Sequence, residues 1–168
     1  MSAKWSAVMR PGVKAAVAVA SAAVLSLSVV GENLIRKWEG EKHTAYLDSV
    51  GVPTICVGST RGVKLGDRET PAGCQERLRI DVSHAGKALA QCVTAPVSQG
   101  QYDALLSLTF NVGGGAVCNS TLVRELNAGR CTRAAEQFHR WVYAGGVKLR
   151  GLVNRRADEY LLFVKDCP

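Results

Sequence analysis

Residues 15–31, AAVAVASAAVLSLSVVG, contain no charged side chain, and this limits what the beginning of the chain can fold into. They follow a stretch that contains Lys4, Arg10 and Lys14 but no acidic residue. As a helix the run would be about 25 Å long, slightly shorter than the hydrocarbon core of a bilayer, which is about 30 Å thick. Because a positive flank stays in the cytoplasm, the segment predicts export of the residues that follow it.

Three interpretations of this segment remain open. A cleaved signal peptide would be cut at one of the small-residue sites between residues 18 and 28. A permanent membrane anchor would normally contain more Leu and Ile than this run does. The third interpretation is an uncleaved, marginal anchor that can later leave the bilayer, because Ala, Ser and Gly cost less to expose than large apolar side chains. All three predict an N-terminal segment, residues 1–31, and an exported domain, residues 32–168.

The exported part is predicted to be one mostly helical α+β domain with a single β-hairpin. Residues 33–40 form a short amphipathic helix pattern that Gly40 ends. The alternation over residues 44–58, around a turn-rich tetrad that begins at Asp48, predicts the hairpin. Apolar periodicity and capping residues predict further helices over residues 71–93, from Ser98 to Asn111, over 119–127, from Thr132 to Gly145, and over 152–165.

Composition limits the class of partner. The net charge is +7, and 47% of the residues are hydrophobic, which is enough for one core. A positive chain favours an anionic partner, such as nucleic acid, a membrane surface or a bacterial cell wall. The basic residues are scattered and do not alternate with aromatic ones, so we expect no nucleic-acid partner.

The cysteine pattern predicts disulfides rather than a metal site. No Cys-x-x-Cys pair occurs, and no Cys/His group has zinc-ligand spacing. An even number of cysteines in an exported chain favours disulfides, whereas buried thiols would be the alternative in a cytosolic protein. We expect Cys56 to pair with Cys74, which would tie the hairpin to the long helix. Without a separate argument, we assign the remaining pairs as Cys118–Cys131 and Cys92–Cys167.

The segment WEGEKHTAYLDSVGVPTICVGST, residues 38–60, holds three side chains that suit cleavage of a glycosidic bond. Glu39 lies at a helix end beside Trp38, where partial desolvation would favour its protonated form. Asp48, in a hairpin turn, would be more hydrated and ionised. Two carboxyl groups in different environments are what glycoside hydrolysis needs, and the hydroxyl of Thr54 could hold the attacking water. Each residue type is also common at such surface positions, so this spacing alone leaves an ordinary structural role open.

This segment resembles the catalytic segment of phage-type lysozymes, glycoside hydrolase family 24, in the order and spacing of its Glu, Asp and Thr. FNVGGGAVCNSTLVRELNAG, RWVYAGG and GLVNRRADE are similar to later segments of that family. The resemblance covers residues 32–164 and, with the N-terminal segment, extends to the signal-anchor-release endolysins of lambdoid phages. Ser59 departs from the family pattern, which often has a histidine there.

The resemblance implies a lysozyme-like fold and a muramidase without a cofactor. Its substrate would be the β-1,4 bond between N-acetylmuramic acid and N-acetylglucosamine in peptidoglycan, and the result would be host cell lysis. It implies that Glu39 is the general acid, that Asp48 and Thr54 handle the water, and that the anomeric centre is inverted. Arg155 matches an arginine near the acid, and Gly113 matches a loop beside the saccharide cleft. A solvated helix charge and a helix C-cap are the respective alternatives.

Localisation follows from the N-terminal segment. We expect a monomer that is tethered to the inner membrane and later released into the periplasm. Because only a few residues separate Gly31 from Glu39, the tethered form should be inactive. A lytic transglycosylase and a non-catalytic wall-binding protein are the alternative functions.

Overall fold

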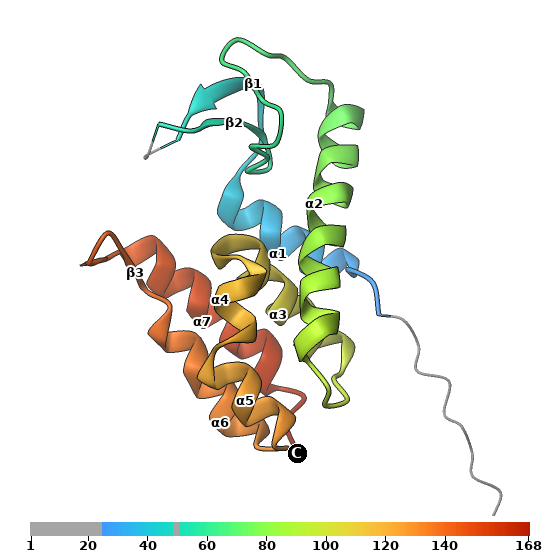
Figure 1. Cartoon of the computed structure of the whole chain (residues 1–168), viewed down its shortest axis with the longest axis vertical. Helices are drawn as coiled ribbons and strands as arrows, with labels where there is room; N and C mark the ends of the chain where they lie inside the picture. The colour runs from blue at the N-terminus through green and yellow to red at the C-terminus, as the bar shows by residue number, and fades with distance from the viewer. Residues whose placement is uncertain (1–24, 49–50) are drawn as a thin grey trace, which may run out of the picture.

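In the computed structural model of the chain, residues 25–48 and 51–168 are described. A small hairpin lobe lies at one end, a helical lobe forms the rest, and α2 runs from one lobe to the other (Figure 1). The elements in chain order are α1 Val29–Glu39, β1 Lys42–Leu47, β2 Pro53–Cys56, α2 Pro71–Cys92, α3 Gln99–Val112, α4 Gly114–Cys118, α5 Thr121–Asn127, α6 Cys131–Glu136, the 3-10 helix η1 Gln137–Arg140, β3 Tyr143–Ala144, β4 Val147–Lys148 and α7 Arg150–Val164.

Helix α1 begins earlier than the sequence predicted. Its N-cap is Ser28, whose side chain accepts a hydrogen bond from the backbone N–H of Gly31. The first turn therefore uses the end of the uncharged N-terminal run, and the helix crosses the predicted boundary between residues 31 and 32. The rest of that run, residues 15–24, and most of the small-residue cleavage sites lie outside the described residues.

The local signals for the two longest helices of the first half are confirmed. Thr70 caps α2 and accepts a hydrogen bond from Gly73 N at 3.0 Å, with Pro71 at the first helical position. Ser98 and Gln101 form the predicted capping box at the start of α3. None of the helices in the described part of the chain is both long and apolar enough to cross a bilayer.

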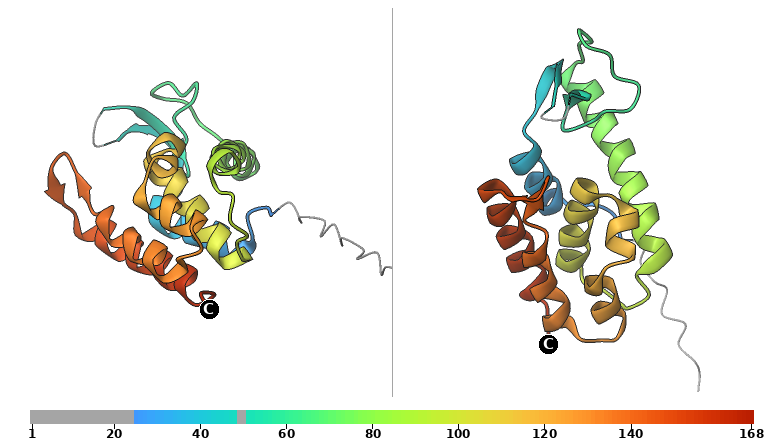
Figure 2. Two further views of the ribbon diagram at one scale, coloured as in Figure 1. Left: turned by 60° about the horizontal axis from the view of Figure 1, so that its bottom comes forward. Right: turned by 60° about the vertical axis from the view of Figure 1, so that its left-hand side comes forward.

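The main core surrounds α3, and this explains why a largely apolar helix is stable there. Leu105, Leu106 and Leu108 are fully buried between α2 on one side and α7 on the other. Phe138 of η1 and Phe163 of α7 pack against each other, with ring centroids 5.4 Å apart. Figure 2 shows α5, α6 and α7 gathered in the lobe away from the hairpin.

The expectation of a single hairpin is wrong. Tyr143 and Ala144 pair antiparallel with Lys148 and Val147, so a second, two-residue hairpin follows η1. Its turn is Gly145-Gly146, and both glycines adopt positive φ, at 55° and 78°. Two residues with positive φ are what the tightest hairpin turns require. The glycine pair, which we interpreted as a helix end, is therefore a hairpin turn.

The short helices in the second half also differ from prediction. The expected helix 119–127 is α5, which begins at Thr121 after its cap Ser120, and an unpredicted short helix, α4, precedes it. Thr132 lies inside α6, because that helix already begins at Cys131. These are shifts of a few residues at helix ends, where local sequence preferences are weakest.

All six cysteines form disulfides, but two of the three predicted pairs are wrong. Cys56–Cys74 is confirmed and ties β2 to α2. Cys118–Cys131 and Cys92–Cys167 are not formed; Cys92 instead pairs with Cys118, and Cys131 pairs with Cys167. The observed pairs join elements that pack together: the end of α2 to α4, and the start of α6 to the residues after α7. Packing between helices decides these pairs, and sequence separation does not reveal it.

Candidate active site

Glu39 is the last residue of α1, and Gly40 ends the helix with φ at 69°. The Glu39 side chain is 19% exposed, and its two oxygens have different surroundings. Oε1 accepts a hydrogen bond from Arg155 Nη1 at 2.6 Å. Oε2 faces Gly58, where a Cβ atom would lie only 3.1 Å away, and the ring of Phe110 lies beside it. One oxygen is thus held by a cation while the other points toward a space that glycine leaves open.

A buried charged network on α7 and α3 holds Arg155 in place. Arg155 Nε donates to Glu159 Oε1 at 3.1 Å, and its Nη2 donates to the backbone oxygen of Ser107 at 3.2 Å. Glu159 is fully buried and also accepts from the hydroxyl of Ser107 at 2.7 Å. Arg156, equally buried, contacts both oxygens of Glu159. The guanidinium that meets Glu39 is therefore fixed by Glu159 and Ser107.

Burial affects the protonation of this network. It raises the pKa of the Glu159 carboxyl above its ordinary value, although Arg156 and Arg155 both oppose the shift. Burial also lowers the pKa of Arg156 to about 10, with Glu159 opposing. Both shifts reflect the cost of removing charges from water. We therefore regard the network as a device that orients Arg155 rather than as a large net source of stability.

A hollow of about 310 Å³ is lined by Gly58, the glycine that Glu39 Oε2 faces, whereas Glu39 itself is not a lining residue. Its lining also includes Phe110, whose ring would lie 3.7 Å from a Cβ atom at Gly58. Gly113, with φ at 88°, ends α3, as the helix C-cap interpretation predicted, and it also lines this hollow. Its other lining residues are Thr60, Arg61, Asp81, His84, Ala85, Ala88, Thr109 and Gly114.

Asp48 and Thr54 lie together at the other end of the hairpin and are joined through Val52. Asp48 Oδ1 accepts from Val52 N at 2.8 Å, and the Thr54 hydroxyl donates to the Val52 carbonyl at 3.0 Å. Thr54 is only 4% exposed. Since its hydroxyl hydrogen is already used, Thr54 can act toward a water only as a hydrogen-bond acceptor.

The strand register separates Glu39 from this pair. Lys42 pairs with Cys56 near the end of α1, whereas Leu47 pairs with Pro53 beside Asp48. Two strand residues span about 7 Å, which is the distance along β2 from the level of Cys56 to Thr54.

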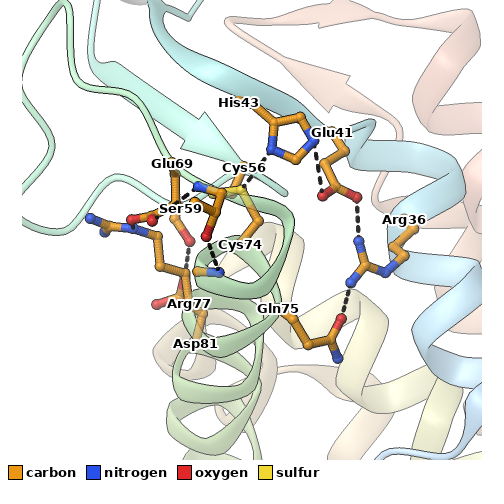
Figure 3. The surroundings of a disulfide bond; sticks show 12 residues. Arg36, Glu41, His43, Cys56, Ser59, Glu69, Cys74, Gln75, Arg77 and Asp81 are labelled. Atoms are coloured by element: carbon orange, nitrogen blue, oxygen red, sulfur yellow. Dashed lines mark hydrogen bonds and ion pairs between the residues drawn. A yellow bond between two sulfur atoms is a disulfide. The ribbon is translucent and has the colours of Figure 1, made fainter.

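Side chains from α1, β1 and α2 contact one another at the base of the hairpin (Figure 3). Arg36 of α1 binds both Glu41 and Gln75, the latter from α2. Glu41, His43 and Cys74 lie close enough together to suggest a metal site. However, the sulfur of Cys74 is bonded to Cys56, so it offers no thiolate. We therefore treat this group as structural support for the hairpin.

The predicted site residues are thus found in two groups. Glu39 and Arg155 are in direct contact, so a solvated role for Arg155 is wrong. Asp48 and Thr54 share the turn of the hairpin. Ser59, in the position of the family histidine, is buried and donates a hydrogen bond to Asp81.

Sequence reasoning missed Glu159, Arg156 and Ser107. Arg155 and Glu159 are four residues apart, the spacing at which opposite charges meet on a helix surface. That spacing could have indicated an ion pair, but it could not have indicated that the pair is buried against α3.

Comparison with known proteins places this geometry in a wider context. A family model described as "Phage lysozyme" matches residues 36–159. The SAR-endolysin of Enterobacteria phage P21 is 34% identical over 152 residues, covering 90% of this chain and 92% of the relative.

Two solved structures are similar in both fold and sequence. The muramidase domain of SpmX from Asticaccaulis excentricus has a TM-score of 0.78 and 33% identity, covering 83% of this chain and 98% of that one. The endolysin from Escherichia coli O157:H7 phage FAHEc1 also has a TM-score of 0.78 and 33% identity, covering 83% and 94%.

Proposed function

This chain belongs to the phage lysozyme family, and we propose that Glu39, Asp48 and Thr54 carry out its reaction. The protein is an endolysin, a muramidase that hydrolyses the β-1,4 bond between N-acetylmuramic acid and N-acetylglucosamine in peptidoglycan. The catalytic assignment rests on the different surroundings of the two carboxyl oxygens of Glu39. Arg155 holds Oε1, and Oε2 faces Gly58, which lines the hollow.

The proposed chemistry needs a proton donor and a positioned water. Glu39 Oε2 would give its proton to the bridging oxygen, so that the leaving sugar departs as an alcohol. The carboxylate of Asp48 would accept a proton from the water as it attacks the anomeric carbon from the opposite face. Thr54 would accept the second hydrogen of that water and fix its position. The water adds to one sugar, and the bond to the other breaks, so the atoms balance.

Product analysis tests this proposal against a lytic transglycosylase. Hydrolysis adds one water to each cleaved chain and leaves a reducing end, whereas transglycosylation leaves an anhydro sugar of unchanged total mass. We expect mass spectrometry of digested peptidoglycan to show reducing ends alone. Anhydro products would overturn the roles of Asp48 and Thr54. Tight binding to peptidoglycan without any cleavage would instead indicate a wall-binding protein.

We also propose that residues 1–31 form an uncleaved membrane anchor that can be released, preceding a catalytic domain from residue 32 onward. Support comes from the uncharged run at residues 15–31 and from the SAR-endolysin relatives. The enzyme would be exported, held at the inner membrane and then freed into the periplasm. Peptidoglycan is its substrate, and we propose that it acts as a monomer, which sedimentation would test.

Locking the anchor tests this regulation. Replacing Ala18, Ala20 and Ala22 by leucine should keep the chain in the membrane fraction and abolish lysis, because a more apolar segment leaves the bilayer less readily. Replacement of the same three residues by serine is the matched control and should still permit lysis. If the leucine variant lysed cells while remaining membrane-bound, release would not be required for activity.

A further inference from the structure

We propose that Asp103 is a positioning residue for the reaction: it seats the beginning of helix α1 so that Glu39, at the end of that helix, lies correctly. Asp103 is on α3 and is only 1% exposed. It touches neither the hollow nor Glu39, and its effect would pass entirely through α1. The proposal rests on the assignment of Glu39 as the acid.

The side chains of Asp103 and Gln99 form the surface that we call the Asp103 seat. Asp103 accepts a hydrogen bond from Ser28 N at 3.1 Å and another from the Ser28 hydroxyl. Gln99 Nε2 donates to the carbonyl of Ser26 and to Asp103, each at 2.9 Å. The residues just before α1 are therefore held by both backbone and side-chain contacts.

Gly31 allows the first turn of α1 to approach this seat closely. A Cβ atom at this position would lie 2.6 Å from Leu27 Cδ1 and 2.7 Å from Asp103 Cγ. A larger residue there would displace the side chain of Leu27 or Asp103, or α1 itself. Gly31 is itself buried. This close approach indicates that contacts with α3 fix the position of the first turn of α1.

Helix α3 controls both ends of α1. Asp103 holds its beginning, while Ser107, one turn further along α3, holds Arg155, which in turn binds Glu39 at the end of α1. Lys37 and Trp38 add a further attachment near that end, since both donate to Asp158 of α7. The eleven residues of α1 span about 16 Å, so loss of the first attachment lets the helix pivot about the second.

A pair of helix-cap variants of the full-length, released chain tests the positioning role. Ser28→Ala removes one donor to Asp103 and the cap of α1. Ser120→Ala is the matched control, because Ser120 caps α5 through a bond of the same 3.3 Å length but has no contact with α1. Both should lower the melting temperature, since each loses one helix cap, and Ser28→Ala should lower it further because buried Asp103 also loses a donor.

Only the Ser28→Ala variant should lose turnover. We expect kcat on soluble peptidoglycan fragments to fall about tenfold with KM unchanged, since a small misplacement of a catalytic group can cost up to about 100-fold. Hydrogen exchange in α1 should be faster. Ser28→Thr, which keeps the hydroxyl, should restore kcat. Asp103→Asn should behave like Ser28→Ala, because the asparagine amide nitrogen cannot accept one of the two hydrogen bonds that Ser28 donates to Asp103.

Equal kcat values in Ser28→Ala and Ser120→Ala, measured where both are folded, would overturn the positioning role. So would an unchanged exchange rate in α1. Failure of the proposed function looks different, because the unaltered protein would then fail to release reducing ends at all.

Discussion

Replacing Glu159 by glutamine is expected to lower the melting temperature by roughly 10 °C. The reason is that Glu159 is the shared partner of two buried arginines, Arg155 and Arg156. Breaking a buried ion pair by removing one partner leaves a charge without compensation and costs about 3–5 kcal/mol. In a domain of this size each kcal/mol lowers the midpoint by about 2–4 °C. Thermal unfolding followed by circular dichroism measures the effect.

The matched control is Glu76→Gln, which removes the same charge from an exposed ion pair with Arg79. Because water screens that pair, the midpoint should stay close to that of the unaltered protein. The Glu159 variant should also lose activity beyond its loss of stability, since Arg155 would no longer be fixed beside Glu39. Similar melting temperatures for the two variants would mean that the network does not hold the lobe together.

Local signals in the sequence were sufficient for the longer helices. Thr70-Pro71 and the pair of Ser98 and Gln101 act within one helical turn, so their effect is readable without tertiary structure. The same holds for Asp48 in the hairpin turn. The proposed catalytic segment was assigned through its resemblance to a family, because the spacing of its three side chains on one short stretch left an ordinary structural role open.

Contacts between distant segments could not be predicted in the same way. The partners of Cys92 and Cys131 depend on which helices pack together, and no periodicity encodes that. The start of α1 was placed too late because residues 29–31 were interpreted only as part of an apolar run. Their helical state follows from contacts with α3. One such contact joins Ser28 to Asp103, which are 75 residues apart in the sequence.

The burial of the charged residues beside Glu39 also depends on contacts between distant segments, so it could not be predicted from the sequence. A resemblance placed Arg155 near the acid, and the structure confirms the contact with Glu39. Glu159, which fixes that arginine, looks in the sequence like any charged residue on an exposed helix face. Its burial depends on α3, which covers it with Ser107.

Replacing Glu39 by glutamine is expected to have the largest effect on activity. Glutamine has nearly the same shape, and its oxygen can still accept the hydrogen bond from Arg155. Its amide has no proton to give to a leaving oxygen at neutral pH, and loss of a general acid typically costs about 10²–10⁴-fold in rate. The fold should be retained, because Glu39 lies at a helix end where a neutral side chain is tolerated. Glu32→Gln, in the first turn of the same helix, is the matched control.

The most direct measurement is the rate at which reducing ends appear in purified peptidoglycan, with each variant at equal concentration and verified as folded. The Glu39→Gln variant should retain less than about a hundredth of the rate of the unaltered protein, while Glu32→Gln should match that protein. A folded Glu39→Gln variant that cleaves at more than about a tenth of the unaltered rate would show that the proton comes from another group.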